Sequence, residues 1–155
     1  MNTRSVAYLK QPHSSTGATP VNSEGTMEEL PVYQWNRKQI LVVEDDESSA
    51  YLLGQILKNT GAQVHHISDG KEAVDYIRAH PETDLVLMDI HLPAKDGFTA
   101  TREIKAISKH VVVIAQTGYA FSVEQQEAKK AGCDGFLVKP LHPRLLLEKL
   151  NAFFS

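Results

Sequence analysis

Four short apolar runs in this sequence end in polar side chains that could work together. In chain order these side chains are Glu44, Asp45, Asp46, Asp89, Gln116, Thr117 and Lys139. A single Asp or Thr behind a strand usually caps a helix or forms a turn, and that explanation suffices for any one of them. It would have to hold at four strand ends at once, which favours a shared purpose. Carboxylates, a hydroxyl and an amine are groups that phosphoryl transfer uses.

Three of the carboxylates, Glu44, Asp45 and Asp89, would repel one another if their strand ends meet. At an effective dielectric constant of about 20, two carboxylates about 4 Å apart cost about 4 kcal/mol. A positive charge must compensate them, and an oxygen-only site suits a hard divalent ion, of which Mg²⁺ fits best. Zinc would call for histidine or thiol ligands, which these strand ends lack. His65 and His66 are strand neighbours that point to opposite faces, and we predict that all seven histidines are structural or surface residues.

Among the acidic residues, Asp89 is the predicted nucleophile. A carboxylate is already ionised at pH 7, so it needs no general base. A cation would bridge it to the phosphoryl oxygens, and Lys139 and Thr117 would supply the remaining contacts. We therefore expect Asp89 to attack phosphorus rather than to act as a general acid.

Strands and helices that alternate from Gln39 onward must position these groups. Four apolar runs predict strands, at residues 40–43, 85–88, 111–115 and 136–138, and residues 63–67 are expected to form the second strand. Residues at helical spacing predict the helices, at Leu53, Ile56 and Leu57, at Ala73, Val74 and Ile77, at Ala100, Ile104 and Ile107, within 122–131, and at Leu146, Leu150 and Phe153. These units predict a doubly wound α/β fold, a flavodoxin-like (βα)5 sandwich with a parallel sheet in the order 2-1-3-4-5. In such sheets functional groups gather outside the carboxyl ends of the strands.

The amino-acid composition limits the possible partners and the cellular location of the protein. The 155 residues include 16 basic and 19 acidic ones, a net charge of −3, with no basic region, so we expect no nucleic-acid partner and no membrane contact. The only cysteine, Cys133, excludes an internal disulfide and fits a reducing compartment. No apolar stretch approaches the ~20 residues that span a bilayer, and no secretory signal is visible. We expect a cytoplasmic location.

The first part of the chain differs in character from the rest. Residues 1–38 mix small, polar and proline residues without a sustained period, which predicts a largely flexible N-terminal leader. Only its end, around Tyr33 and Trp35, looks able to dock. Met27 offers an alternative start. We predict one domain at residues 39–155.

At its strand ends the chain resembles the response-regulator receiver family, over residues 39–155. The matching stretches are Ile-Leu-Val-Val-Glu-Asp-Asp at 40–46, Leu-Met-Asp-Ile-His-Leu-Pro at 87–93, Asp96-Gly97, Ala-Gln-Thr-Gly-Tyr at 115–119 and Phe-Leu-Val-Lys-Pro at 136–140. Each stretch is weak alone, but together, in this order and at these separations, they form a specific signature.

The resemblance implies roles for the acidic residues. Asp89 would be phosphorylated. Glu44, Asp45, Asp89 and the backbone carbonyl of His91 would hold Mg²⁺. Glu44 stands where the family often has Asp, and Asp46 is left as a bystander or a helix cap.

The resemblance also implies a switch. Thr117 and Lys139 would contact the phosphoryl group, with Lys139-Pro140 resembling the family's cis peptide. Phe136 looks like the family's switch aromatic and would pack into space that the Thr117 loop vacates. We expect the mostly polar helix at 122–131 to be loosely held and to report the change.

The implied donor is a histidine kinase or a histidine phosphotransfer protein, and the implied recipient of the signal is a downstream protein target. The stretch after Ile114 looks like receivers of hybrid kinases, and the helix with Leu52, Leu53 and Ile56 is the expected docking surface. Because nothing follows Ser155, we expect no attached output domain. Such a protein catalyses only its own phosphorylation and dephosphorylation and is not otherwise an enzyme.

Three other interpretations use parts of the same pattern. An aspartyl-nucleophile phosphatase of the haloacid dehalogenase type also attacks phosphorus with a strand-end Asp, but such enzymes resemble one another in a second Asp two positions on, where this chain has His91. A flavin-binding module would need a Ser/Thr/Gly-rich loop after the first strand, and here that loop is acidic. A receiver that only binds proteins would not need the complete set of polar residues.

Overall fold

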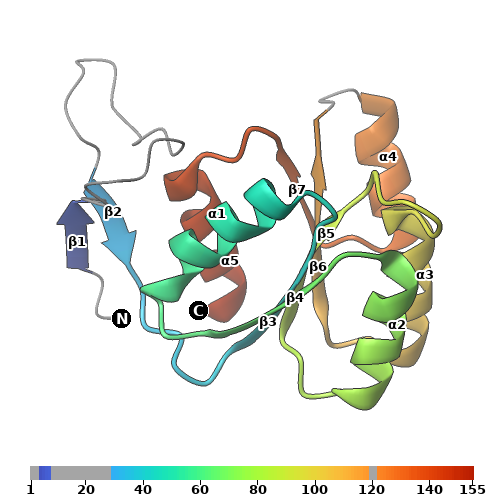
Figure 1. The fold of residues 1–155 in the computed structure, drawn as a ribbon, viewed down its shortest axis with the longest axis horizontal. Coiled ribbons are helices and arrows are strands. Elements are labelled where there is room, and N and C mark those ends of the chain that lie inside the picture. The colour runs from blue at the N-terminus through green and yellow to red at the C-terminus, as the bar shows by residue number, and fades with distance from the viewer. Residues whose placement is uncertain (1–3, 8–28, 119–121) are drawn as a thin grey trace.

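The central layer of the molecule is a parallel sheet of five strands rich in aliphatic residues. The computed structural model describes residues 4–7, 29–118 and 122–155 (Figure 1). The five strands are β3 (Gln39–Val43), β4 (Gln63–Ile67), β5 (Leu85–Asp89), β6 (Val112–Thr117) and β7 (Gly135–Val138). They lie in the order β4-β3-β5-β6-β7, all parallel. Counted from β3, this is the predicted order 2-1-3-4-5, which is confirmed.

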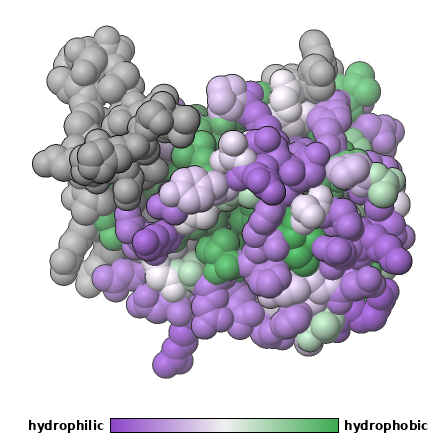
Figure 2. Space-filling view, viewed as in Figure 1, coloured by the Kyte–Doolittle hydropathy of each residue, from purple (hydrophilic) through white to green (hydrophobic). Residues whose placement is uncertain are grey.

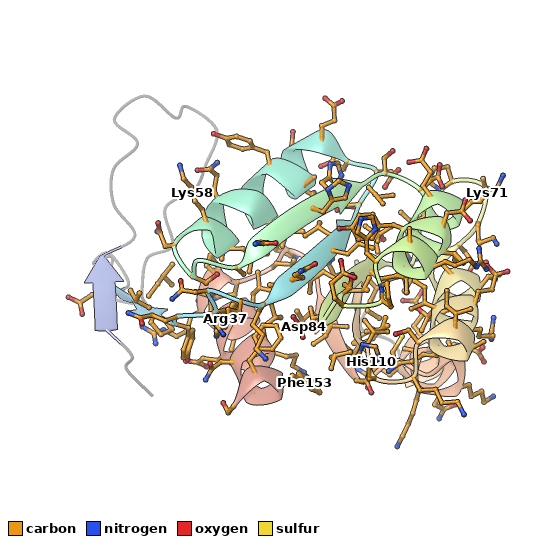
Figure 3. All side chains as sticks on the ribbon, turned by 90° about the horizontal axis from the view of Figure 1, so that it is seen from below. Arg37, Lys58, Lys71, Asp84, His110 and Phe153 are labelled. Atoms are coloured by element: carbon orange, nitrogen blue, oxygen red, sulfur yellow. The ribbon has the colours of Figure 1, made fainter. Side chains whose placement is uncertain are left out.

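Helices cover both faces of this sheet. On one face lie α1 (Glu47–Lys58) and α5 (Pro143–Phe154); on the other lie α2 (Gly70–Ala79), α3 (Gly97–Ile107) and α4 (Ser122–Ala131) (Figure 1). Figure 3 shows side chains on both sides of the sheet, with the labelled Lys58 and Lys71 directed away from it. Most residues predicted at helical spacing are buried, but Ile107 is 42% and Phe153 is 39% exposed. Both lie in the last turn of their helices, where neighbours on one side are missing.

Aspartates fix the starts of three helices. Asp46 accepts a hydrogen bond from the Ser49 N–H at 2.8 Å, and Asp69 accepts one from the Glu72 N–H at 2.7 Å. Asp96 accepts bonds from the next two free N–H groups of α3 at 2.9 and 3.0 Å. The first turn of a helix leaves its N–H groups without intrahelical partners, and these carboxylates satisfy them. Asp46 and Asp96 thereby order the loops after β3 and β5.

Two short strands precede the sheet. β1 (Arg4–Ala7) and β2 (Glu29–Val32) pair antiparallel and form a separate sheet. They are not predicted from the sequence, because neither stretch shows a sustained alternation. Most of the predicted leader, Met27 included, lies outside the described residues, so the boundary at residue 38 stays a prediction.

The segment that follows β2 joins the core between α1 and α5. Tyr33 and Trp35 stack with ring centroids 5.5 Å apart, and Trp35 meets Phe154 edge-on at 5.0 Å. The Trp35 indole N–H donates to Asn151 at 3.2 Å, and the Trp35 backbone N–H donates to the Thr60 carbonyl at 2.7 Å. Trp35 is only 4% exposed. This segment therefore seals one end of the core.

The outer surface is mainly polar. In Figure 2 hydrophilic residues predominate on the visible face, with hydrophobic residues in small groups between them. Within the described part of the chain, no helix has the length and apolar character needed to cross a bilayer.

Replacing Trp35 should destabilise the fold. Trp35→Ala removes a fully packed indole and leaves a cavity, so we expect the free energy of unfolding to fall by about 3–5 kcal/mol. Urea unfolding measures it. The matched control is Tyr51→Ala, since Tyr51 is 69% exposed on α1; its effect should stay within about 0.5 kcal/mol. Equal effects of the two substitutions would contradict the packing role of Trp35.

Candidate functional site

The carboxyl ends of the parallel strands bring the predicted acidic residues together. One oxygen from each of Glu44, Asp45 and Asp89 lies within 4.8 Å of the other two. Glu44 is 0% and Asp89 is 4% exposed, whereas Asp45 is exposed. Two of the three carboxyl groups are thus withdrawn from water and meet the third at the surface.

Lys139 is the cation of this cluster. Its ammonium group lies 2.5 Å from Glu44 Oε1 and 3.2 Å from Asp89 Oδ2. Lys139 directly follows β7, and its peptide bond to Pro140 is cis, as the resemblance implies. One lysine therefore links the ends of β3, β5 and β7.

One buried oxygen of this cluster is left over. Among the described residues, Glu44 Oε2 has no hydrogen-bond donor. A buried carboxylate oxygen without a donor is costly unless it meets a cation or a proton. Together with Asp45 and Asp89 it forms an all-oxygen set, which fits a hard divalent ion.

Burial and neighbouring charges shift the pKa values of the cluster. Burial and the neighbouring Asp89 carboxyl group together raise the pKa of Glu44 to about 7, against the opposing effect of Lys139. Burial alone would raise the pKa of Asp89 too, but hydrogen bonds from Glu44 and the His91 N–H outweigh it. With the charge of Lys139 added, the pKa of Asp89 ends below its usual value. A proton bound by this pair of carboxyl groups therefore resides on Glu44 rather than on Asp89.

The backbone holds the Asp89 carboxylate in place. The His91 N–H donates to Asp89 Oδ1 at 2.9 Å. Behind the strand end, Gly97 at the start of α3 packs directly on the Asp89 backbone carbonyl, and a Cβ at this position would collide with it. A glycine is required here because two backbone segments touch.

Asp46 serves α1 and not the cluster. Its carboxylate accepts hydrogen bonds from both the N–H and the hydroxyl of Ser49, at 2.8 and 2.7 Å. The sequence left Asp46 as a bystander or a helix cap, and the geometry identifies it as the cap of α1.

Thr117 has a partner that the sequence does not indicate. Its hydroxyl donates to Glu124 Oε2 at 2.6 Å, and the His91 ring lies 3.4 Å from both Glu124 Oε1 and Thr117 Oγ1. The prediction that all histidines are structural or surface residues did not include these contacts of the His91 ring with Glu124 and Thr117. Glu124 lies beyond a loop, so no periodic pattern connects it to Thr117.

Two more residues predicted near the site lie on β6 and β7. Phe136 is partly buried against a small cluster of Ile90, Ala115 and Ala128. Gln116 pairs with Asp89 in the strand register. The Gln116 amide is fully buried and has no partner within the described residues.

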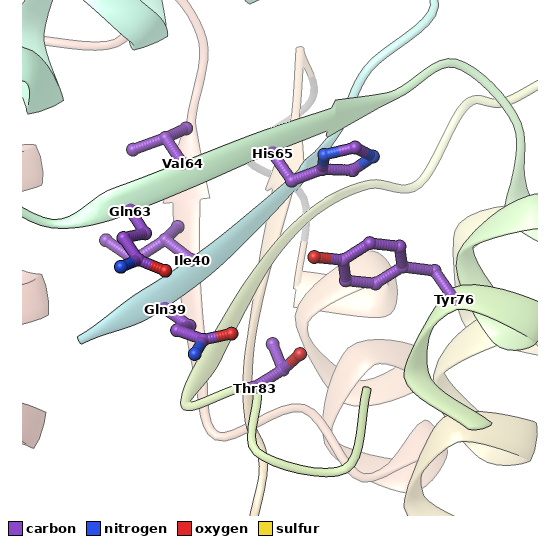
Figure 4. Close-up of a pocket in the computed structure, with 7 residues that line it drawn as sticks. All are labelled: Gln39, Ile40, Gln63, Val64, His65, Tyr76 and Thr83. Carbon is purple, nitrogen blue, oxygen red and sulfur yellow. The ribbon is translucent and has the colours of Figure 1, made fainter. Parts of the chain in front are cut away.

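One hollow of the described structure lies at the other end of the sheet. It measures about 210 Å³ and is lined by Gln39, Ile40, Gln63, Val64, His65, Tyr76 and Thr83 (Figure 4). The rings of His65 and Tyr76 stack across its rim at 4.6 Å. No carboxylate lines it, so this hollow is separate from the acidic cluster.

The fold and the cluster define the class of protein. The sequence matches the family model of the response regulator receiver domain over residues 40–151. The chain therefore belongs to the response regulator receiver domain family, which acts in two-component signal transduction. The phosphatase alternative is not supported.

The chain is similar to one response regulator of its own size and to receiver domains of histidine kinases. The polar-differentiation response regulator DivK of Brucella anthropi is 30% identical over 120 residues, covering 76% of this chain and 97% of DivK. Probable histidine kinase 4 of Oryza sativa subsp. japonica is 30% identical over 140 residues, which cover 76% of this chain and 14% of that protein. The receiver domain of sensor histidine kinase PA1611 from Pseudomonas aeruginosa PAO1, whose crystal structure has a magnesium ion coordinated in the active site cleft, is 32% identical with a TM-score of 0.70. That alignment covers 76% of this chain and 98% of the PA1611 domain, and the similarity to receivers of histidine kinases is confirmed.

Stability should depend on pH through Glu44. The pKa of Glu44 is raised from 4.5 to about 7, so the folded metal-free protein binds more protons than the unfolded chain between these values. Stability should therefore fall as pH rises from about 4.5 to 7, by up to about 3 kcal/mol, and level off above. Urea unfolding in a chelator at several pH values tests this.

Two substitutions isolate that contribution. Glu44→Gln cannot ionise and should flatten the fall between pH 4.5 and 7. The control is Glu47→Gln, which removes an exposed carboxyl group from the first turn of α1 and should keep the wild-type profile. A Glu44→Gln profile parallel to that of wild type would sink the assignment.

Proposed function

We propose that Asp89 accepts a phosphoryl group from a phosphohistidine of a partner protein. In this step the P–N bond to the histidine breaks and a P–O bond to an Asp89 carboxylate oxygen forms. The observation that carries the proposal is the position of the Asp89 carboxyl group at the end of β5, 3.2 Å from the Lys139 ammonium group, and the lowered pKa of Asp89 agrees with it. Family membership adds support, since two-component receivers work in phosphoryl signalling.

The same proposal includes Mg²⁺ as the cofactor. Glu44, Asp45 and Asp89, with the backbone carbonyl of His91, would hold the ion. The unpaired Glu44 Oε2 and the all-oxygen donor set support this choice. When bound, Mg²⁺ neutralises charge that develops on the phosphoryl oxygens.

The remaining polar groups contact the phosphoryl group. The Lys139 ammonium group has three protons, so it can donate to a phosphoryl oxygen while it keeps contacts with its carboxylate partners. Thr117 turns its hydroxyl toward the phosphoryl group. Phe136 then repacks, and the surface formed by α4 and β7 changes. The loose packing of α4 supports its part in this switch, since among its described residues only Ala128 and Ala131 are buried.

The proposed partners follow from the chemistry. The donor is a histidine kinase or a histidine phosphotransfer protein, docking beside the acidic loop and α1, where Tyr51 and Leu52 are 69% and 38% exposed. The signal then passes to a downstream protein target. We place the protein in the cytoplasm, without nucleic acid as a partner, and assign it no catalysis beyond its own phosphorylation and dephosphorylation.

A small acyl phosphate should phosphorylate Asp89. Incubation of the full chain with Mg²⁺ and acetyl phosphate, followed by intact mass, should show one phosphate adduct in wild type. Asp89→Asn removes the nucleophile and should show none. The matched control is Asp84→Asn, which changes a carboxylate at the opposite end of β5, labelled in Figure 3. Absence of an adduct in wild type, or its persistence in Asp89→Asn, would overturn the proposal.

Mg²⁺ binding should distinguish two adjacent aspartates. Asp45→Ala removes a member of the acidic cluster and should weaken Mg²⁺ binding by at least about tenfold, whereas Asp46→Ala removes only the cap of α1. Isothermal titration calorimetry measures both. We expect Asp46→Ala to lower stability by about 1 kcal/mol and to leave Mg²⁺ affinity nearly unchanged. Equal losses of affinity would mean that the metal ligands are misassigned.

A further inference from the structure

Glu124 stands between the predicted phosphoryl site and the helix that is expected to report on it. It lies in the first turn of α4, and its Oε2 accepts the Thr117 hydroxyl at 2.6 Å. Thr117 is the last residue of β6 and is fully buried. This hydrogen bond therefore ties the end of a central strand directly to the start of α4.

The Thr117 hydroxyl can serve only one acceptor at a time. A hydroxyl carries a single proton, so it donates either to Glu124 or to a phosphoryl oxygen. Asp89 pairs with Gln116 in the strand register, and Thr117 follows Gln116 at the same edge of the sheet. A phosphoryl group on Asp89 and the Glu124 carboxylate would therefore compete for one donor.

Electrostatic repulsion between a phosphoryl group and the Glu124 carboxylate adds to this competition. A phosphoryl group adds up to two negative charges, which repel a nearby carboxylate. Glu124 Oε1 lies 3.4 Å from the ring of His91, and His91 follows Asp89 by two positions in the sequence. Glu124 therefore lies on the same side of the sheet edge as the predicted phosphoryl site. Once the Thr117 hydroxyl leaves, both effects favour movement of Glu124 away from the site.

Among the described residues, the first turn of α4 has no buried side chain of its own. The buried residues of this helix, Ala128 and Ala131, lie in its second half, while Val123 is 66% exposed. Displacement of Glu124 would therefore free the amino end of α4 without breaking its packed end.

We propose that Glu124 is a positioning residue that retains the Thr117 hydroxyl in the unphosphorylated protein and competes with a phosphoryl oxygen for it. This inference rests on the proposed function of Asp89. Loss of the hydrogen bond couples the state of Asp89 to the first turn of α4. Removal of Glu124 should therefore make the phosphoryl-bound state easier to reach.

Binding of a phosphoryl mimic tests the competition. Beryllium fluoride with Mg²⁺ is titrated into the full chain and followed by ¹⁹F NMR. Glu124→Ala should bind it about tenfold more tightly than wild type, since a charge-assisted hydrogen bond no longer has to be broken. The control is Glu127→Ala, which removes the same charge from α4 at a residue whose carboxylate faces Lys130 at 3.6 Å. It should bind within about twofold of wild type.

A double-mutant cycle shows whether Glu124 acts through Thr117. In a Thr117→Val background, Glu124→Ala should no longer improve binding. An equal gain with and without Thr117, no gain at all, or the same gain in Glu127→Ala would each overturn the inference. Thermal unfolding of each variant confirms that it folds.

A measurement without phosphoryl groups separates this inference from the proposed function. NMR of the unmodified protein should show altered Thr117 side-chain signals in Glu124→Ala and unaltered ones in Glu127→Ala. Unchanged Thr117 signals in Glu124→Ala would overturn the inference even if Asp89 is phosphorylated. If wild type binds no mimic and forms no adduct, the proposed function fails and the competition with it.

Discussion

The crowding of three carboxyl groups, two of which share one lysine, is the constraint on which the rest of this structure depends. Parallel strands end at the same edge, so Glu44 and Asp89 are brought close by topology alone. Lys139 compensates one charge, and a proton on Glu44 compensates a second. The pKa of Glu44, raised to about 7, lets its carboxyl group keep a proton into the neutral range when no cation is bound. The binding of a cation would thus replace a proton, which links metal affinity to pH.

The loops that carry the cluster are ordered by groups outside it. Asp46 and Asp96 cap α1 and α3, and Gly97 packs on the Asp89 backbone. These contacts fix the backbone that carries the carboxyl groups of the cluster, and they do not use the oxygens of those carboxyl groups. Preorganisation of this kind lets a site bind a cation or a phosphoryl group without first folding its loops.

The sequence predicts most of the sheet and the members of the cluster, and it does so for physical reasons. Buried strands appear as apolar runs, and each ends at a polar residue, so the order of elements and the meeting of Glu44, Asp89 and Lys139 follow from the parallel topology. The β1–β2 pair escapes prediction because its strands have four residues each and no alternation. The Thr117–Glu124 hydrogen bond escapes it because a loop separates the two residues, and no spacing rule spans a loop of that kind.

The packing of Tyr33 and Trp35 between α1 and α5 has a consequence for anything joined to the chain ahead of β2. Because this segment is anchored beside the carboxyl end of α1, a peptide or domain attached there would be tethered close to the helix on which a kinase is expected to dock. Tethering raises the local concentration of a weak ligand to the millimolar range when the linker is short. An attached segment with even modest affinity for α1 would compete with a free partner. A segment joined at the amino-terminal side of this domain would therefore be positioned to cover the docking helix of its own chain.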